Sequence, residues 1–366
     1  MKRLLVCLLL LGVVGCGEEN AVDPHLLRTI DIPKGSGWGQ KICVSPDGSR
    51  FASGIGASEV EMNIWDCDGF LKSSFSKREN SLVTFINPRE LPVDGIVFSP
   101  DWSYFATYKR ISRRQQGLNI WSYRDRDPGR FVLPDLPDSG VDLAIFDTKG
   151  ERLAYLQNNA TSEGGHPTVQ VTIRSGKSFR ESVTLENVPE AKQINLMAFS
   201  PGGDRLVART IHDGLIMWDL NTEKLIFTDY DWEAQPGVDI LMFSPDGKQF
   251  VVIGSSSSSG EENSSGGGGI EIRNSDDGNL VKNTLGYRPI SISRDWKWFA
   301  TTKSNHKKDM EDIQIHDMEN GDIEFTLRGH TGHIVDVDFS ADRSRLVSVA
   351  IDRTFKIWDL TDLSSP

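Results

Sequence analysis

The 366-residue sequence is poor in cysteine and lacks the motifs of common catalytic sites. Its four cysteines stand at positions 7, 16, 43 and 67, and no Cys/His spacing is typical of zinc. It has no Gly-x-Ser-x-Gly elbow, no phosphate-cradling glycine loop between strand and helix, and no His-Glu-x-x-His. We therefore expect no catalytic residue, no metal and no cofactor, and we predict that the protein is not an enzyme.

Positive charge is also scarce. Asp and Glu total 52 against 40 Lys and Arg, which gives a formal net charge of −12 at pH 7. Nucleic-acid-binding proteins ordinarily present a basic surface, so we expect no nucleic acid among the partners. No long amphipathic helical pattern occurs, which leaves no room for a separate catalytic domain.

A charged start, an apolar run and a small residue follow one another at the N-terminus. Residues 1–16 read MKRLLVCLLLLGVVGC. This order is typical of a secretory signal peptide, and the apolar run is too short for a stable bilayer span. We predict a signal peptide over residues 1–15. Its only charged residues are Lys2 and Arg3, so its removal would change the net charge from −12 to −14.

A turn motif recurs along the rest of the chain. It begins at Ser45 as SPDG, and its copies and degraded forms begin at Ser99, Asp147, Ser200, Ser244, Ser293 and Ser340. These seven starts lie 44 to 54 residues apart, close to the length of one propeller blade. Strand-like alternation precedes the turns, as in Val335, Val337 and Phe339 of the last unit. The repeat predicts seven similar all-β units.

A second recurring feature is a Trp-Asp-like pair that ends a later strand of each unit. The pairs are Trp65-Asp66, Trp121-Ser122, Arg174-Ser175, Trp218-Asp219, Arg273-Asn274, His316-Asp317 and Trp358-Asp359. Three units have Arg or His where the others have Trp. Only the last unit is complete, so we expect most units to be held by packing and by strand-to-strand hydrogen bonds alone.

The last unit, residues 329–360, reads GHTGHIVDVDFSADRSRLVSVAIDRTFKIWDL and closely resembles one repeat of the WD-repeat (WD40) β-propeller family. The resemblance implies four-stranded antiparallel blades. It also implies a structural tetrad of hydrogen-bonded side chains, which falls on His330, Ser348, Asp352 and Trp358.

Too few residues follow Trp358-Asp359 for a fourth strand, whereas residues 26–32 form an additional strand-like run before the first unit. We predict that this N-terminal strand closes the ring as the outer strand of the last blade, as in the WD-repeat family. The propeller would then occupy residues 26–362. The alternative, an open solenoid of sheets, would expose strand edges at both ends.

The motif VVGC at residues 13–16 resembles the lipobox of bacterial lipoproteins. The resemblance implies cleavage before Cys16 and lipid, palmitate included, on its sulfur and amino group. Residues 16–25 would then be the lipidated cysteine and a short tether. Gly17, rather than Asp, follows the cysteine, which favours the periplasmic side of the outer membrane. An ordinary signal peptide cut nearby is the alternative.

Insertions and aromatic residues gather in loops that we expect on one face. The partner-binding candidates there are Trp38, Arg110, Arg113, Arg114, Tyr230 and Trp232. The same face would carry a flexible Ser/Gly-rich loop at residues 255–269. These side chains could instead lie flat on neighbouring loops. Near the opposite turns, we expect Trp298 in the core and Trp102 and Trp296 packed against adjacent blades.

The two cysteines of the propeller, Cys43 and Cys67, fall in the first and third strands of the first unit, too far apart for a disulfide. We expect two free, packed thiols.

We interpret the protein as a membrane-anchored WD-repeat lipoprotein of the cell envelope, a non-catalytic platform for protein partners outside the cytoplasm. One alternative is a propeller hydrolase or lyase, which would need His, Asp or Glu side chains converging at the central channel. A second is a small-ligand or glycan-binding propeller, which would need a roomy aromatic pocket.

Overall fold

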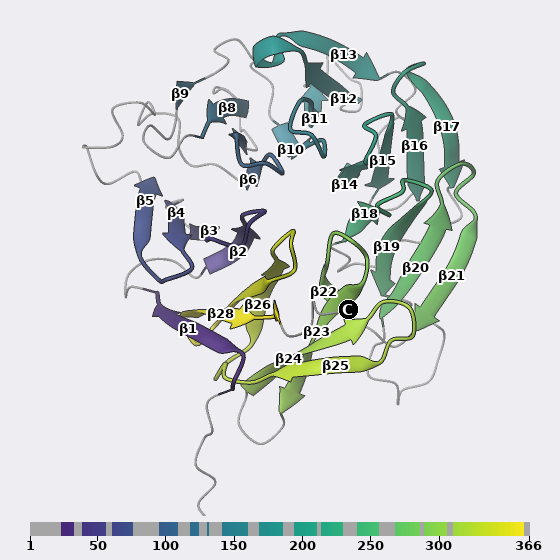
Figure 1. Cartoon of the computed structure of the whole chain (residues 1–366). Helices are drawn as coiled ribbons and strands as arrows, with labels where there is room; N and C mark the ends of the chain where they lie inside the picture. Colours follow the sequence, from purple (N-terminus) through teal and green to yellow (C-terminus); the bar gives the residue numbers. More distant parts are fainter. Residues whose placement is uncertain are drawn as a thin grey trace, which may run out of the picture.

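The protein folds as a ring of seven antiparallel sheets, each with four strands (Figure 1). The computed structural model describes residues 23–32, 39–55, 61–75, 95–108, 118–123, 130–131, 141–159, 168–185, 194–210, 214–229, 240–255, 268–285, 289–305 and 310–361. Apart from one short 3-10 helix, η1 (Lys177–Phe179), the regular elements of this part are strands. The prediction of a seven-bladed all-β propeller is confirmed.

Each blade is ordered from the inside of the ring outward. Blades 1 to 4 are β2(Gly39–Val44), β3(Arg50–Ile55), β4(Glu61–Asp66) and β5(Leu71–Phe75); β6(Gly95–Phe98), β7(Tyr104–Tyr108), β8(Leu118–Ser122) and β9(Arg130–Phe131); β10(Val141–Phe146), β11(Leu153–Asn159), β12(Thr168–Ser175) and β13(Glu181–Leu185); β14(Ile194–Phe199), β15(Arg205–Thr210), β16(Leu215–Asp219) and β17(Lys224–Asp229). Blades 5 to 7 are β18(Leu241–Phe243), β19(Gln249–Ser255), β20(Gly268–Asn274) and β21(Leu280–Leu285); β22(Pro289–Ile292), β23(Trp298–Asn305), β24(Met310–Asp317) and β25(Ile323–Leu327); β26(Ile334–Phe339), β27(Arg345–Ala350), β28(Thr354–Asp359) and β1(Leu26–Asp31).

The recurring turn motif connects the first and second strands of every blade. In blade 1, Ser45 Oγ donates to Asp47 Oδ1 at 2.7 Å, and Ser45 Oγ accepts from the Arg50 backbone N–H at 2.9 Å. The serines at 99, 244, 293 and 340 repeat both bonds, and Ser200 does so with Asp204, four residues on, as the acceptor. In blade 3, Asp147 replaces the serine and accepts from two backbone N–H groups. The motif recurs because it satisfies the polar groups of this tight turn.

The fourth residue of each turn adopts a left-handed backbone conformation. Four turns place glycine there, whereas Trp102, Trp296 and Arg343 occupy it in the degraded copies with φ near +60°. Such a conformation is costly for residues with a Cβ. Local contacts hold them: Trp102 stacks on Phe98 at 4.6 Å between ring centroids, and Arg343 bonds Asp295 of blade 6 at 2.9 Å.

A separate hydrophobic core fills the space between each pair of neighbouring blades. The clusters join blade pairs 7/1, 1/2, 2/3, 3/4, 4/5, 5/6 and 6/7. Alternation along the strands explains this, because successive side chains point toward opposite neighbouring blades. As expected, Trp298 lies in the 6/7 core, Trp102 packs with blade 1, and Trp296 packs against the 5/6 core.

The ring closes through β1, as predicted. β1 pairs antiparallel with β28, with Leu26 opposite Trp358 and Asp31 opposite Thr354. The pairing continues beyond the strand, because the Ile32 N–H donates to the Arg353 carbonyl at 2.8 Å. The N-terminal strand therefore supplies the fourth strand of the last blade.

Two smaller expectations meet different outcomes. Cys43 and Cys67 are free thiols; burial raises their pKa values to about 12 and about 11. The proposed loop at residues 255–269 is shorter than predicted, because β19 continues through Ser255 and β20 begins at Gly268. Pairing between Ser255 and Gly268 extends the ladder into the Ser/Gly-rich segment.

Candidate functional site

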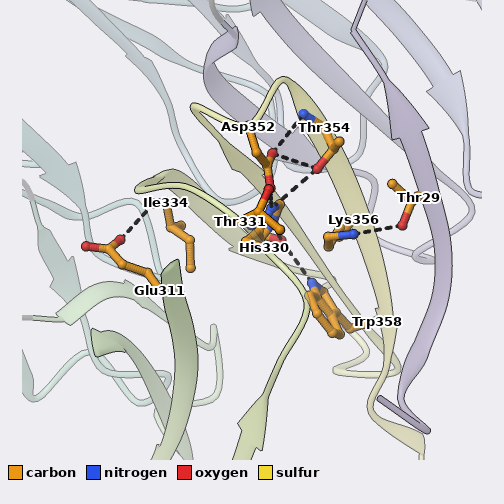
Figure 2. A network of polar contacts seen from close by, with 10 residues as sticks. Thr29, Glu311, His330, Thr331, Ile334, Asp352, Thr354, Lys356 and Trp358 are labelled. Carbon is orange, nitrogen blue, oxygen red and sulfur yellow. Dashed lines mark hydrogen bonds and ion pairs between the residues drawn. The ribbon is translucent and has the colours of Figure 1, made fainter. Parts of the chain in front are cut away.

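Blade 7 brings His330, Ser348, Asp352 and Trp358 into one hydrogen-bonded chain. Figure 2 labels His330, Asp352 and Trp358 of this chain. Trp358 Nε1 donates to Ser348 Oγ at 2.9 Å. Ser348 Oγ lies 2.7 Å from His330 Nε2, and His330 Nδ1 lies 2.9 Å from Asp352 Oδ2. β27 and β28 supply Ser348 and Trp358, while the flanking connections supply His330 and Asp352.

The partners fix the protonation of His330. A carboxylate can only accept a hydrogen bond, so His330 Nδ1 carries a proton and donates to Asp352. His330 Nε2 is then unprotonated and accepts from the Ser348 hydroxyl. Burial lowers the pKa of His330 despite the opposing effect of Asp352. His330 is therefore neutral near pH 7, and its bond to Asp352 is a hydrogen bond rather than an ion pair.

Asp352 satisfies the connection around it with both carboxylate oxygens. Oδ2 also accepts from the Thr331 N–H at 2.8 Å, and Oδ1 accepts from the Thr354 N–H at 3.0 Å and the Thr354 hydroxyl at 2.8 Å. Burial opposes ionisation, but these bonds and the bond from His330 outweigh it and lower the pKa of Asp352 to about 2. Nearby, Lys356 Nζ donates to Thr29 Oγ1 at 2.8 Å and links β28 to β1 (Figure 2).

The expectation that the incomplete blades lack such side-chain bonds is wrong for three of them. In blade 1, Trp65 Nε1 donates to Ser53 Oγ at 3.1 Å. In blade 6, His316 replaces the tryptophan, and its Nε2 lies 2.9 Å from Thr301 Oγ1. In blade 5, Arg273 Nη1 instead bonds Asp229 of blade 4 at 2.7 Å.

A register rule explains the bonds of blades 1, 6 and 7 and the missing bond of blade 4. Ser348 stands on β27 two residues after Leu346, which faces Trp358. Ser53 and Thr301 hold the same place, and each meets a ring N–H or imidazole. Blade 4 has Ala208 there, and Trp218 Nε1 has no hydrogen-bond partner among the described residues. The pattern pairs a hydroxyl on the second strand with an aromatic nitrogen on the third.

A second polar cluster, which the sequence reasoning missed, joins the innermost strands of blades 7 and 1. Asp336 Oδ2 accepts from the Ile42 N–H at 2.8 Å, and Asp338 Oδ2 accepts from the Val44 N–H at 2.7 Å. Burial, together with the nearby Asp336 carboxylate, raises the pKa of Asp338 to about 7, even though the Val44 N–H opposes the shift. The Asp-x-Asp spacing on a strand was the available signal, since it places both carboxylates on one face.

The other predicted site residues lie outside the described residues. These are Cys16, Trp38, Arg110, Arg113, Arg114, Tyr230 and Trp232. Across the described ranges, no three His, Cys, Asp or Glu side chains gather in a way that could hold a metal ion. Those same ranges contain no helix long and apolar enough to span a bilayer. The polar clusters that are described serve the framework of the propeller.

We predict that Ala208→Ser stabilises the protein. The new hydroxyl would accept from Trp218 Nε1, which is buried and without a partner, and the free energy of unfolding should rise by about 1 kcal/mol. Ala300→Ser is the matched control, because Ala300 is as fully buried but faces away from the hydroxyl position held by Thr301. Denaturant unfolding should show the control destabilised; a loss of stability in both variants would refute the register rule.

We predict that Asp352→Ala lowers the free energy of unfolding by about 1–3 kcal/mol, because it leaves buried donors without an acceptor. The folded-state pKa of Asp352 is lowered, so its contribution is full above about pH 4 and is lost as the pH falls toward 2. The stability difference between wild type and Asp352→Ala should shrink over that range.

Asp246→Ala is the control for this prediction. Asp246 lies in the turn between β18 and β19 of blade 5 and accepts from Ser244 and Lys248 at an exposed position, so it is a turn aspartate outside the blade 7 chain. Equal losses in the two variants would contradict a special role for the blade 7 chain.

Comparisons with known proteins agree with this geometry. The family model for the WD domain, G-beta repeat (WD40), matches residues 321–359, which cover the tetrad and β25 to β28. Autophagy-related protein 16 of Arabidopsis thaliana is 33% identical over 97 residues, 25% of this chain and 18% of that protein. Protein HIRA of Oryza sativa subsp. japonica is 44% identical over 46 residues, 13% of this chain and 5% of that protein. The chain thus matches less than a fifth of either relative's length.

A solved structure extends the likeness to nearly the whole fold. The β-propeller domain of Cps50 (Swd1) from Myceliophteria thermophila superposes with a TM-score of 0.59 at 13% sequence identity. The superposition covers 90% of this chain and 99% of that domain. At that identity the likeness concerns the fold alone. Taken with the sequence match at residues 321–359, it supports a WD40-type seven-bladed propeller.

Proposed function

We propose that this protein is a membrane-anchored WD-repeat lipoprotein that acts outside the cytoplasm as a non-catalytic platform for protein partners. The observation that carries the platform role is the closed seven-bladed ring, a rigid scaffold from which connecting segments can present side chains to a partner. The matched WD-repeat proteins support an interaction role in the same general sense.

The use of polar side chains in the described residues supports a non-catalytic role. The two buried histidines with lowered pKa values, His316 and His330, are both bonded to hydroxyl groups of their own blades. The strongly shifted carboxyls, Asp338 and Asp352, accept backbone N–H groups. Groups consumed in this way stabilise the ring and are not free to react with a substrate.

The signal-like N-terminus and the VVGC motif support the anchor. We place the protein in the cell envelope, with the periplasmic side of the outer membrane favoured by Gly17. The partner face is the one with the insertions, where Arg113 and Trp232 stand. Its basic residues would attract an acidic protein partner locally, despite the net negative charge of the whole chain.

We predict that Cys16→Ser releases the protein from membranes, because the acyl chains would have no attachment site. Fractionation of cells at high salt is the measurement, and the wild-type protein should sediment with membranes. Ser45→Ala, a turn substitution far from the N-terminus, should sediment like the wild type. A Cys16→Ser protein that still sediments with membranes would refute anchoring through this residue.

Capture of partners from solubilised membranes, with the intact lipoprotein as bait, tests the platform role. Trp232→Ala and Arg113→Glu should each weaken capture of one identified partner. The control is Leu225→Ala on the outer strand β17, because Leu225 is exposed and its replacement should not disturb packing. A buried residue such as Trp102 would not serve, since its replacement would disturb the core. Capture that survives both loop variants but is lost with Leu225→Ala would instead place the binding surface on the outer strands of the blades.

A further inference from the structure

Exposed apolar side chains are unevenly distributed around the outer wall of the ring. On the outermost strands and the turns that lead into them, the most exposed are Leu27, Phe70, Leu71, Leu280, Val281 and Ile323, at 44 to 66% exposure. All six belong to blades 5, 6, 7 and 1, whereas the side chains of β9 in blade 2 lie outside the described residues. On the outer strands of blades 3 and 4, the exposed apolar residues Val183 and Leu225 are 37% exposed. Among the described outer-strand side chains, the most exposed apolar ones therefore lie on one side of the ring.

The described chain begins in the middle of this wall. Asp23 is buried, and its Oδ2 accepts from the Arg328 N–H, just beyond β25, at 2.8 Å. The His25 ring lies edge-on to Phe325 of β25, with 5.2 Å between centroids. Asp23 and His25 thus fix the segment that leads into β1 at the junction of blades 6 and 7, between β1 and β25 (Figure 1).

Exposed residues flank this junction on both sides. Ile323 begins β25 of blade 6, and Leu27 lies on β1 of blade 7. On the far side of β1, a Cβ at Gly69 would lie 3.4 Å from Ile30 Cγ1, so the turn before β5 rests against β1. Phe70 and Leu71 follow Gly69 directly. We name Leu27, Phe70, Leu71 and Ile323 the anchor-side wall.

We propose that the anchor-side wall rests on the lipid bilayer, so that the propeller lies with this edge against the membrane. The inference rests on the proposed lipid anchor at Cys16. Seven residue steps separate Cys16 from Asp23 and span at most about 25 Å when fully extended. An anchor at Cys16 would therefore hold these exposed side chains within reach of the bilayer surface.

The composition of the wall suits the interfacial region of a bilayer. Phe70 is its most exposed member, and aromatic and aliphatic side chains partition into that region. The Lys72 ammonium lies 5.9 Å from the Phe70 ring centroid and 2.6 Å from Asp66 Oδ2, which leaves a polar border beside the apolar tip. A tether keeps the local concentration of bilayer high, so a weak contact is sufficient.

The convex ring limits how many blades touch a flat surface at once. The contact is made by the anchor-side wall, which lies on both sides of residues 23–25 and consists of Leu27, Phe70, Leu71 and Ile323. Leu280 and Val281 of blade 5 lie at the border of this contact. With the anchor-side wall on the bilayer, both flat faces of the propeller remain accessible to solvent. Partners can then reach the proposed partner face without displacing lipid.

Fluorescence quenching on the intact lipoprotein tests this orientation. Phe70→Cys and Ile323→Cys, each labelled with an environment-sensitive fluorophore, are reconstituted in phosphatidylcholine vesicles that contain head-group-nitroxide lipid. Matched controls are Leu225→Cys, at the corresponding place on β17 of blade 4, and Ile351→Cys, exposed on the turn between β27 and β28. Protein without an added cysteine gives the background signal. This background should be low, because burial raises the pKa values of Cys43 and Cys67 and so disfavours the reactive thiolate.

We expect several-fold stronger quenching at positions 70 and 323 than at positions 225 and 351. Flotation of the vesicles separates the two ways to fail. Protein that floats with the vesicles but shows equal quenching at all four positions retains its anchor and overturns the wall contact alone. Protein that does not float overturns the anchor and the wall contact together. Stronger quenching at position 351 would turn the loop face toward the membrane and overturn the proposal.

Discussion

The pairing of β1 with β28 is the constraint on which the rest of the ring depends. Without β1, blade 7 would have three strands and an exposed edge along β28. β1 also completes two hydrophobic cores, because Ile30 lies in the 7/1 cluster and Leu26 packs against the 6/7 cluster. A propeller is stabilised by its interfaces between blades, so loss of this one strand weakens both neighbours of blade 7. The buried bonds of Asp336, Asp338 and Lys356 concentrate at the same closure.

The repeat count and the closure were predictable from the sequence because both depend on local chemistry. The Ser-x-Asp turn satisfies its own backbone, so it survives as a recognisable pattern even where the glycine is lost, as at Trp102 and Arg343. The missing fourth strand after Trp358 required a partner from elsewhere, and residues 26–32 were the available strand-like run. Short-range patterns and a strand deficit were therefore sufficient for the architecture.

Contacts between blades were not predictable in the same way. The bond of Arg273 to Asp229 joins residues 44 positions apart on different sheets, and the bond of Asp336 to Ile42 joins residues 294 apart. The hydroxyl paired with each aromatic nitrogen depends on the register between the second and third strands, where a slip of one residue would turn the hydroxyl to the other face of the sheet. The candidate partner residues stand in segments outside the described ranges, where the sequence argument alone supports them.

Seven similar blades arranged in a ring are nearly equivalent by rotation. A feature that distinguishes one blade is therefore needed if the ring is to bind in one orientation. The chain supplies two such features. The structural tetrad is complete in blade 7, which also receives β1, and Asp23 fixes the segment before β1 against blade 6 at the same junction. Under the proposed anchor at Cys16, a tether would leave from this point and pull on the blade with the most complete hydrogen-bond chain. That pull would be borne by β1, which is paired along β28, rather than by a surface loop.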